Sequence, residues 1–204
     1  MLNLIFSNLI SKFSNDENLK ADYWQEIEKN YSQKSRKYHN LLHLENMILE
    51  LEPVKDQILD YETLLFSVFY HDIIYKSTSK DNEEKSAEIA KKSLEKLDIS
   101  SERVIKIYNQ ILATKSHQKC KDSDTNFLLD ADLAILGKDW KIYEQYTQQI
   151  RKEYSIYPDF LYNPGRKKVL IHLLEFDEIF KTEYFKEKYE KIARENIQRE
   201  IELL

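Results

Sequence analysis

Residues Tyr61–Tyr75 read YETLLFSVFYHDIIY, the most apolar stretch of the chain. Apolar side chains occupy almost every position rather than a single stripe, which is typical of a helix that is buried on all sides. We therefore predict a central helix over this stretch. His71 and Asp72 interrupt it near its end. A buried helix normally excludes such polar groups unless a partner compensates them, so this pair is the first indication of a functional site.

The sequence on both sides of this stretch also has helical periodicity. Leu19, Tyr23, Ile27 and Tyr31 follow one another at intervals of four, which places them on one helix face. Only 2 glycines and 3 prolines occur among 204 residues, too few to punctuate many short strands. We predict an all-α single domain, 1–204, with nine or ten helices, in which a C-terminal helix over 182–204 packs on the core. The other expected helices cover 2–13 and 16–31 at the N-terminus, and then 40–51, 82–97, 100–116, 126–136, 141–157 and 166–176.

The composition excludes several classes of protein. The glycines that GxGxxG and GxxxxGK phosphate-binding loops require are absent. Cys120 is the single cysteine, which forbids an intrachain disulfide and a CxxC zinc knuckle. The net charge of −5 disfavours binding of long nucleic acid. No apolar run is long enough to cross a membrane, and the start of the chain lacks the basic region of a signal peptide, so we expect a cytoplasmic protein.

Histidines and aspartates form the one pattern that indicates chemistry. His39 and His43 are four residues apart, so they share a face if they lie on one helix. Asp130 and Asp132 are carboxylates within another largely apolar stretch. Imidazole and carboxylate groups together suit a first-row divalent metal ion, which would also compensate their burial. Spacing alone leaves scattered structural groups as an equally open alternative.

The order of these residues resembles that of a known superfamily. His43, the pair His71-Asp72, and Asp132 resemble the His…His-Asp…Asp pattern of the all-helical HD superfamily of metal-dependent phosphohydrolases. The segment Tyr38–His43, YHNLLH, is similar to the YHNxxH motif of class I cyclic-nucleotide phosphodiesterases. A wider resemblance, to a family of small predicted metal-dependent HD phosphohydrolases, covers most of the chain in the blocks SRKYHNLLHLENM, YHDIIYKSTSKDNEEKSA, ILATKSHQ, LLDADLAILG, IRKEY, GRKKVL and ARENIQREI.

The resemblance implies a role for each residue of the pattern. His43, His71, Asp72 and Asp132 would be the metal ligands, with Asp130 as an alternative ligand or a structural partner of a basic side chain. The ion would be a divalent one, Mn, Fe, Ni, Co, Zn or Mg, in one tight site, with room for a second, weaker site that Asp72 could bridge. Asp72 also counts as a catalytic residue for this reason.

His39 matches the proton donor of the phosphodiesterase motif. We expect it to be the general acid that protonates the leaving oxygen, while hydroxide formed on the metal ion is the nucleophile. The structural alternative is that His39 caps the helix or bonds a backbone carbonyl.

Further residues could contact the substrate. Lys115 and His117 lie at a helix end, and each is a candidate for phosphate binding, with His117 a candidate extra ligand as well; both could instead complement the helix dipole. Arg36 could hold a phosphate or be a surface arginine in a basic link. Glu83 matches a family block, although an acid at a helix start is common for structural reasons. We expect His172, in an apolar helix, to be a core residue.

These observations predict an enzyme. The leading function is hydrolysis of a small phosphoester, with a nucleotide as the favoured substrate. The alternatives are a di-iron oxygenase on the same scaffold, which generally needs more histidines, and a non-catalytic module that binds a nucleotide. The long, charged C-terminal helix could cover the core or form a homodimer contact.

Overall fold

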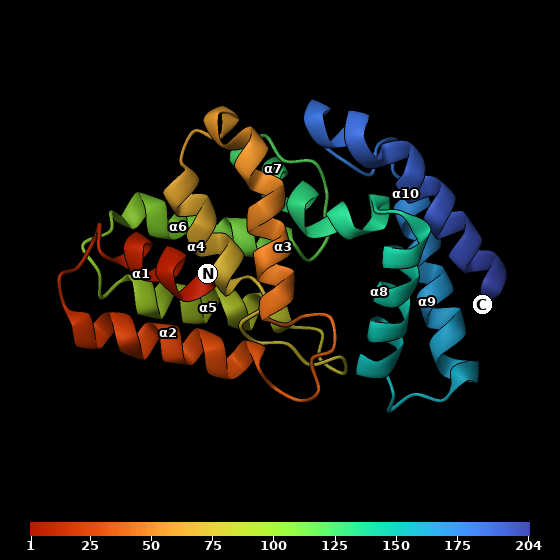
Figure 1. The fold of residues 1–204 in the computed structure, drawn as a ribbon, viewed down its shortest axis with the longest axis horizontal. Coiled ribbons are helices and arrows are strands. Elements are labelled where there is room, and N and C mark those ends of the chain that lie inside the picture. The colour runs from red at the N-terminus through yellow and green to blue at the C-terminus, as the bar shows by residue number, and fades with distance from the viewer.

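The computed structural model describes residues 1–204, and helix α4 (Tyr61–Tyr70) lies at its centre. All of its residues from Thr63 to Tyr70 are buried. Asp60 caps this helix by accepting a hydrogen bond from the Thr63 backbone N–H at 3.1 Å. Five helices pack around α4 (Figure 1), namely α1 (Leu2–Ile10), α3 (Leu41–Leu51), α5 (Asn82–Leu94), α6 (Ser101–Ala113) and α7 (Ser123–Leu133).

The prediction of an all-α fold with about ten helices is confirmed, since the chain forms ten α-helices, two short 3₁₀-helices and no strand. Helix α2 (Glu17–Tyr31) packs against α1. The 3₁₀-helix η1 (Glu52–Gln57) continues α3. The remaining elements are the 3₁₀-helix η2 (Ala134–Gly137) and the helices α8 (Trp140–Glu153), α9 (Asp159–Leu174) and α10 (Glu183–Leu203), which lie side by side at one end of the molecule (Figure 1).

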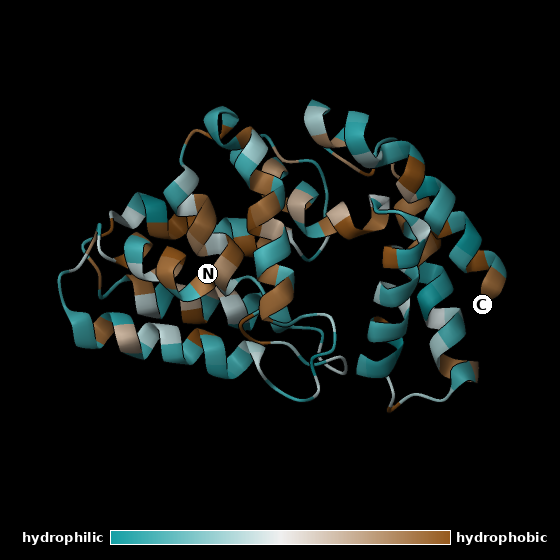
Figure 2. Ribbon diagram, in the orientation of Figure 1, coloured by the Kyte–Doolittle hydropathy of each residue, from teal (hydrophilic) through white to brown (hydrophobic).

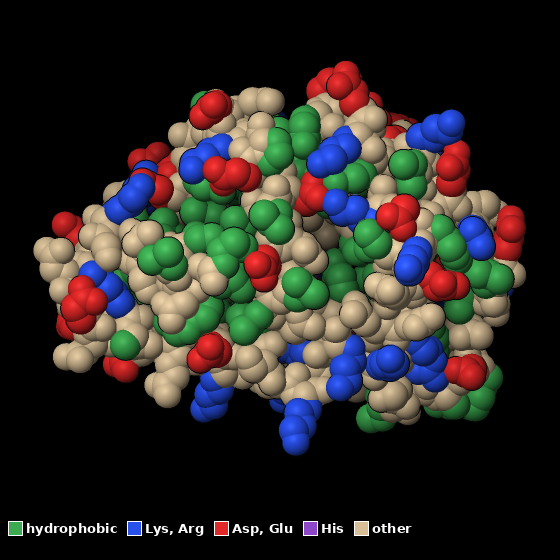
Figure 3. Space-filling view, viewed as in Figure 1, with side chains coloured by type: hydrophobic (Ala, Val, Ile, Leu, Met, Phe, Trp, Pro, Cys, Tyr) green, Lys and Arg blue, Asp and Glu red, His purple; other side chains and the backbone are tan.

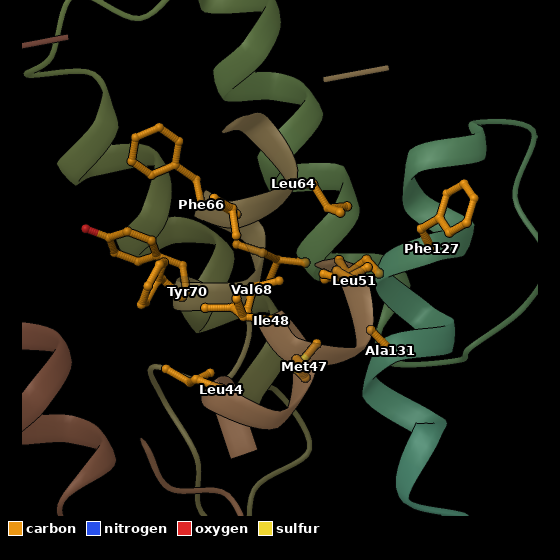
Figure 4. Packing of buried hydrophobic residues seen from close by; sticks show 14 of the residues in the cluster. Leu44, Met47, Ile48, Leu51, Leu64, Phe66, Val68, Tyr70, Phe127 and Ala131 are labelled. Atoms are coloured by element: carbon orange, nitrogen blue, oxygen red, sulfur yellow. The ribbon is translucent and has the colours of Figure 1, made fainter. Parts of the chain in front are cut away.

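One hydrophobic cluster of 40 buried residues joins these elements. The hydrophobic residues concentrate on α3 and α4, whereas α2 and α10 show mostly hydrophilic residues on their outer faces (Figure 2). Side chains from three helices meet in this cluster (Figure 4), including Leu44 and Met47 of α3, Val68 of α4 and Ala131 of α7. Tight packing among α3, α4 and α7 fixes the relative positions of the polar residues that these helices carry.

The largest differences from the predicted helix boundaries are in α4 and α9. Helix α4 ends at Tyr70 rather than Tyr75, and the chain turns at His71. Helix α9 begins at Asp159 and contains Pro164 and the following glycine, which we expected to precede it. The proline removes the N–H that would bond the carbonyl of Phe160. Because Phe160 is 74% exposed, water can donate to that carbonyl, so the helix tolerates the proline.

Asn82, the first residue of α5, contacts the loop that precedes this helix: its side chain accepts a hydrogen bond from the Lys76 N–H and donates one to the Lys76 carbonyl. His172 was expected in the core, but its side chain is 60% exposed on a helix that buries only two residues.

The C-terminal helices join the rest of the chain through η2. Helices α8 and α10 both pack on η2, and α9 packs on α10. Phe185, Tyr189, Ala193 and Ile197 of α10 belong to the hydrophobic cluster. No helix in the fold combines the length and apolar character needed to span a lipid bilayer.

Gly137 at the end of η2 permits the closest of these contacts. An added Cβ would overlap the side chain of Tyr189, whose Cγ would lie only 2.7 Å away. We expect Gly137→Ala to lower the free energy of unfolding by about 1–3 kcal/mol, because the buried neighbours must move apart. Urea unfolding measures the change. Gly165→Ala is the matched control, since a Cβ there meets nothing within 4 Å and alanine favours a helix. Equal effects of the two substitutions would contradict this account.

Candidate metal centre

Three side chains from distant parts of the sequence converge at one buried point. His43 lies in the first turn of α3, His71 directly follows α4, and Asp132 lies in the last turn of α7. His43 Nε2 is 3.2 Å from His71 Nε2 and 3.2 Å from Asp132 Oδ1. His71 Nε2 is 3.9 Å from the same oxygen. Both histidines are at most 3% exposed, and no histidine is visible on the face drawn in Figure 3.

The end of α4 orients His71 for coordination. His71 Nδ1 lies 2.8 Å from the carbonyl oxygen of Val68, and a carbonyl only accepts, so Nδ1 carries the hydrogen. In the neutral ring Nε2 therefore presents a lone pair to the centre. Because the helix has already ended, Asp72 lies on the turn, where its Oδ2 is 3.4 Å from His71 Nε2. The pair thus acts from a turn and not, as predicted, from within a helix.

The charges of the centre favour a bound cation. Burial alone would lower the pKa of His71, but the negative charges of Asp72 and Asp132 outweigh it and raise this pKa to about 9. Burial would raise the pKa of Asp132, yet hydrogen bonds from His117 and His43 hold it well below the usual range. The carboxylates thus remain ionised and attract either a proton on the imidazoles or a metal ion that replaces it.

The donor set fits a first-row divalent metal ion. The ligand atoms of His43, His71 and Asp132 all lie within 4.8 Å of one another. Two imidazole nitrogens and a carboxylate oxygen are a common set for Zn²⁺, Fe²⁺, Mn²⁺ and related ions. Asp72 lies at the edge of this group, beside His71. The three convergent groups are therefore the residues that would hold an ion, with Asp72 available to complete its coordination.

His39 lies next to this group but outside α3, because Asn40 caps that helix. The four-residue spacing predicted that His39 and His43 share a helix face if both lie on one helix, but His39 is not on the helix. The two ring centroids are nevertheless only 5.9 Å apart. His39 Nε2 lies 4.0 Å from Asp72 Oδ2. Its ring stacks on that of Tyr75, with the centroids 4.0 Å apart.

Glu153 is a residue of the candidate site that the sequence did not point to. It ends α8, and its Oε2 is 2.6 Å from His39 Nδ1. The same oxygen accepts a hydrogen bond from the Tyr75 hydroxyl at 3.0 Å. Its Oε1 accepts the backbone N–H groups of Lys37, Tyr38 and His39. Glu153 belongs to the block IRKEY, but no spacing rule relates it to a histidine more than a hundred positions away.

Glu153 also sets the charge of His39. Burial by itself would lower the pKa of His39, but the hydrogen bond to Glu153 and the charges of Asp72 and Glu153 outweigh burial and raise it. The hydrogen bond and charge of His39 in turn lower the pKa of Glu153, despite its burial. The pair therefore favours an imidazolium beside an ionised carboxylate.

Arg36 matches neither of its predicted roles, a phosphate contact or a surface arginine, because it is buried and bonds the backbone. It is only 5% exposed. Its Nη1 donates to the backbone carbonyl of Asp72 at 2.6 Å, and its Nη2 donates to that of Ile73 at 2.8 Å. Arg36 thus ties the segment that carries His39 to the turn that carries Asp72, and it positions both residues.

His117 contacts the metal group, the cluster of His43, His71 and Asp132, through Asp132. Its Nε2 lies 2.9 Å from Asp132 Oδ2, so each oxygen of Asp132 faces a different histidine. His117 is the only residue other than glycine with a positive φ, of 50°. Such a backbone conformation costs energy and is concentrated at functional sites. His117 therefore orients Asp132, and its position also suits an additional ligand.

Asp130 lies outside the metal group and has structural partners. Its carboxylate accepts hydrogen bonds from the backbone N–H groups of Lys181 and Thr182, both at 2.7 Å, and from the Thr182 hydroxyl. Thr182 is the residue that precedes α10. The structural alternative for Asp130 thus involves backbone donors, not the basic side chain that we considered.

We expect Asp130→Ala to lower the free energy of unfolding by about 1–3 kcal/mol, because buried backbone donors at Lys181 and Thr182 would lose their acceptor. Thermal unfolding measures the loss. Metal content should stay at the wild-type level in the folded fraction, since the side chain does not face the centre. If the folded Asp130→Ala protein contained no metal, Asp130 would have to be assigned as a metal ligand.

The other two predicted contacts lie at the rim of the site. Lys115 forms an ion pair with Glu84 and donates a hydrogen bond to the Lys80 carbonyl. Glu83 lines the adjacent cleft together with Lys115. Burial, with the charges of Asp72 and Glu84, raises the pKa of Glu83. Neither residue touches the metal group.

A cleft of about 590 Å³ opens beside the centre and reaches His39 and His117. Its walls come from α8, α9 and the loop between them, from the start of α5, and from the loops before α5 and after α6. Another cavity, of about 640 Å³, lies between α1, η1 and α4, but no residue of the metal group lines it. Its basic side chains are paired, Lys12 with Glu62, Lys55 with Glu52 and Arg103 with Asp60. The cleft at His39 is therefore the candidate substrate site.

Comparison of the chain with protein-family models, with curated proteins and with solved structures finds no match. The function is therefore inferred from the residues of the centre and of the cleft.

Proposed function

We propose that the protein is a metal-dependent phosphohydrolase of the HD superfamily that acts on a small phosphoester such as a nucleotide. The observation that carries this proposal is the buried convergence of His43, His71 and Asp132, whose ligand atoms lie within 4.8 Å of one another. These residues also follow the order of the HD pattern along the chain. Buried acceptors of this kind are otherwise costly, and a divalent cation compensates them.

A divalent ion held there would polarise a phosphoryl oxygen and bring the pKa of a coordinated water toward neutrality. The residues of the chain supply the rest of the chemistry. His39 is the proposed general acid, because Glu153 occupies its Nδ1 at 2.6 Å and leaves Nε2 to hold the proton that is donated. Protonation of the leaving oxygen removes the negative charge that develops as the ester bond breaks.

Arg36 and Glu153 hold this acid in place. Arg36 bonds the carbonyls of the turn at Asp72 and Ile73, while Glu153 bonds three consecutive backbone N–H groups around His39. Rigid support of this kind keeps a catalytic group within a few tenths of an ångström of its working position.

The test combines elemental analysis of the purified protein with phosphate release from a panel of phosphoesters in the presence of Mn²⁺. We expect metal to co-purify with the protein, the melting temperature to rise when metal is added to stripped protein, and at least one ester to be hydrolysed. Absence of metal binding after reconstitution would overturn the proposal. Oxygen uptake with Fe²⁺, in place of phosphate release, would favour the di-iron oxygenase.

A further inference from the structure

The cleft beside His39 is lined by an unusual number of aromatic side chains. Tyrosines from α8, from α9 and from two loops line it, and Ile150, Leu161 and Val169 add apolar wall. Flat apolar surfaces of this kind bind planar rings by stacking. The lining tyrosines are Tyr75, Tyr146, Tyr154, Tyr157 and Tyr162.

The polar tips of these tyrosines favour a ring that carries hydrogen-bonding groups. The Tyr75 hydroxyl is used by Glu153, and the Tyr146 hydroxyl accepts a bond from Arg166. The hydroxyls of Tyr157 and Tyr162 make no hydrogen bond within the protein. They can therefore form hydrogen bonds with a bound nucleobase or sugar. A plain hydrocarbon ring would offer these hydroxyls no partner.

The cations of the cleft are already neutralised. Lys115 is paired with Glu84, and Arg166 is paired with Glu200 through two hydrogen bonds of 2.7 and 3.0 Å. Glu83 adds a further carboxylate to the wall. A chain of phosphates needs unpaired cationic donors or glycine-rich backbone, and this cleft provides neither. The charge of the cleft therefore disfavours a diphosphate or triphosphate.

The position of His39 decides which part of the substrate lies in the cleft. His39 lines the cleft and is also 4.0 Å from Asp72 at the metal group. A general acid must lie within hydrogen-bond reach of the oxygen that it protonates. The phosphoryl group would therefore face His43, His71 and Asp132, while the group that departs would extend from His39 into the cleft.

We infer that the substrate is a nucleoside monophosphate, whose nucleoside occupies the tyrosine cleft and leaves as the free alcohol. This inference rests on the proposed function. In the step, water adds its oxygen to phosphorus, the P–O bond to the nucleoside breaks, and the nucleoside oxygen receives the proton of His39. The products are inorganic phosphate and a nucleoside.

The first test compares kcat/KM for a nucleoside 5′-monophosphate, the matching triphosphate and glycerol phosphate. We expect the monophosphate to be preferred to glycerol phosphate by at least about tenfold, the factor that one lost stacking contact implies. It should also be preferred to the triphosphate, because the paired cations leave the additional phosphates without donors. Tyr154→Leu should lower kcat/KM for the nucleotide about tenfold more than it lowers kcat/KM for glycerol phosphate. Tyr184→Leu, on α10 and away from the cleft, is the matched control and should change neither value.

The second test releases one cation. Glu84→Gln removes the carboxylate that pairs with Lys115, so hydrolysis of the triphosphate relative to the monophosphate should rise severalfold. Glu88→Gln, an exposed carboxylate on the same helix that bonds Tyr108, should leave this ratio unchanged. An unchanged ratio in both variants would overturn the charge argument.

The outcomes separate the two proposals. Equal or better hydrolysis of the triphosphate or of glycerol phosphate would overturn the assignment of the cleft but leave the hydrolase standing. Metal binding without hydrolysis of any ester would overturn the proposed function. In that case calorimetric titration with the nucleoside monophosphate tests the cleft by itself: binding that Tyr154→Leu weakens and Tyr184→Leu does not would support it, and no binding would overturn it.

Discussion

Asp132→Ala and His43→Ala should each abolish metal binding and reduce phosphohydrolase activity by about 10³-fold or more. Each substitution removes one of the three groups whose ligand atoms lie within 4.8 Å, and a metal ion contributes several kcal/mol of transition-state stabilisation in such reactions. Elemental analysis and phosphate release, measured on the same preparation, check both expectations. Circular dichroism shows whether each variant keeps its helices.

His172→Ala is the matched control for this experiment. It removes a histidine that is 60% exposed and pairs only with Glu175, the residue that follows its own helix, so metal content and activity should stay at wild-type values. Retention of stoichiometric metal by folded Asp132→Ala and His43→Ala proteins would mean that the cluster is structural and that the proposed function is wrong.

His39→Gln should keep the metal and lower kcat by about 10²–10⁴-fold, the range that a general acid contributes. Metal stoichiometry and kcat, measured together, separate this result from loss of the metal group. If His39→Gln also lost the metal, His39 would be a ligand and the assignment of the acid would be wrong.

Glu153→Gln tests the residue that positions this acid. The hydrogen bond and charge of Glu153 raise the pKa of His39, so their removal should lower it. A general acid must be protonated to act, and activity therefore falls as pH rises through its pKa. The alkaline limb of the kcat profile should move to lower pH in Glu153→Gln. If kcat fell by the same factor at every pH and the alkaline limb did not move, the role of Glu153 would be structural only.

The helices could be predicted well because their signals are local. In Leu19–Tyr31, for example, Tyr23, Ile27 and Tyr31 are buried at intervals of four, and few glycines or prolines interrupt such stretches. The errors occurred where local rules compete with exposure or packing. Pro164 predicted a helix boundary, but the exposed α9 accommodates it. Tyr61–Tyr75 is apolar throughout, but the chain turns after Tyr70, where the side chain of His71 bonds the carbonyl of Val68.

The choice between Asp130 and Asp132 shows what spacing can and cannot decide. Two residues two positions apart lie about 200° apart around a helix, so only one of them can face a given centre. Which one does so depends on the face of α7 that packs against α3 and α4. The structure turns Asp132 toward His43 and Asp130 toward the start of α10.

By itself the sequence determined the all-helical class and the approximate extent of each helix, because these depend on composition and short-range periodicity. The candidate metal ligands followed instead from the resemblance to the HD superfamily. The tertiary structure alone decided that Glu153 holds His39, that Arg36 is buried against the turn at Asp72, and that tyrosines from α8 and α9 line the cleft. These contacts join residues tens of positions or more apart, and only the packing of whole helices brings them together, since no local pattern encodes the distance between them.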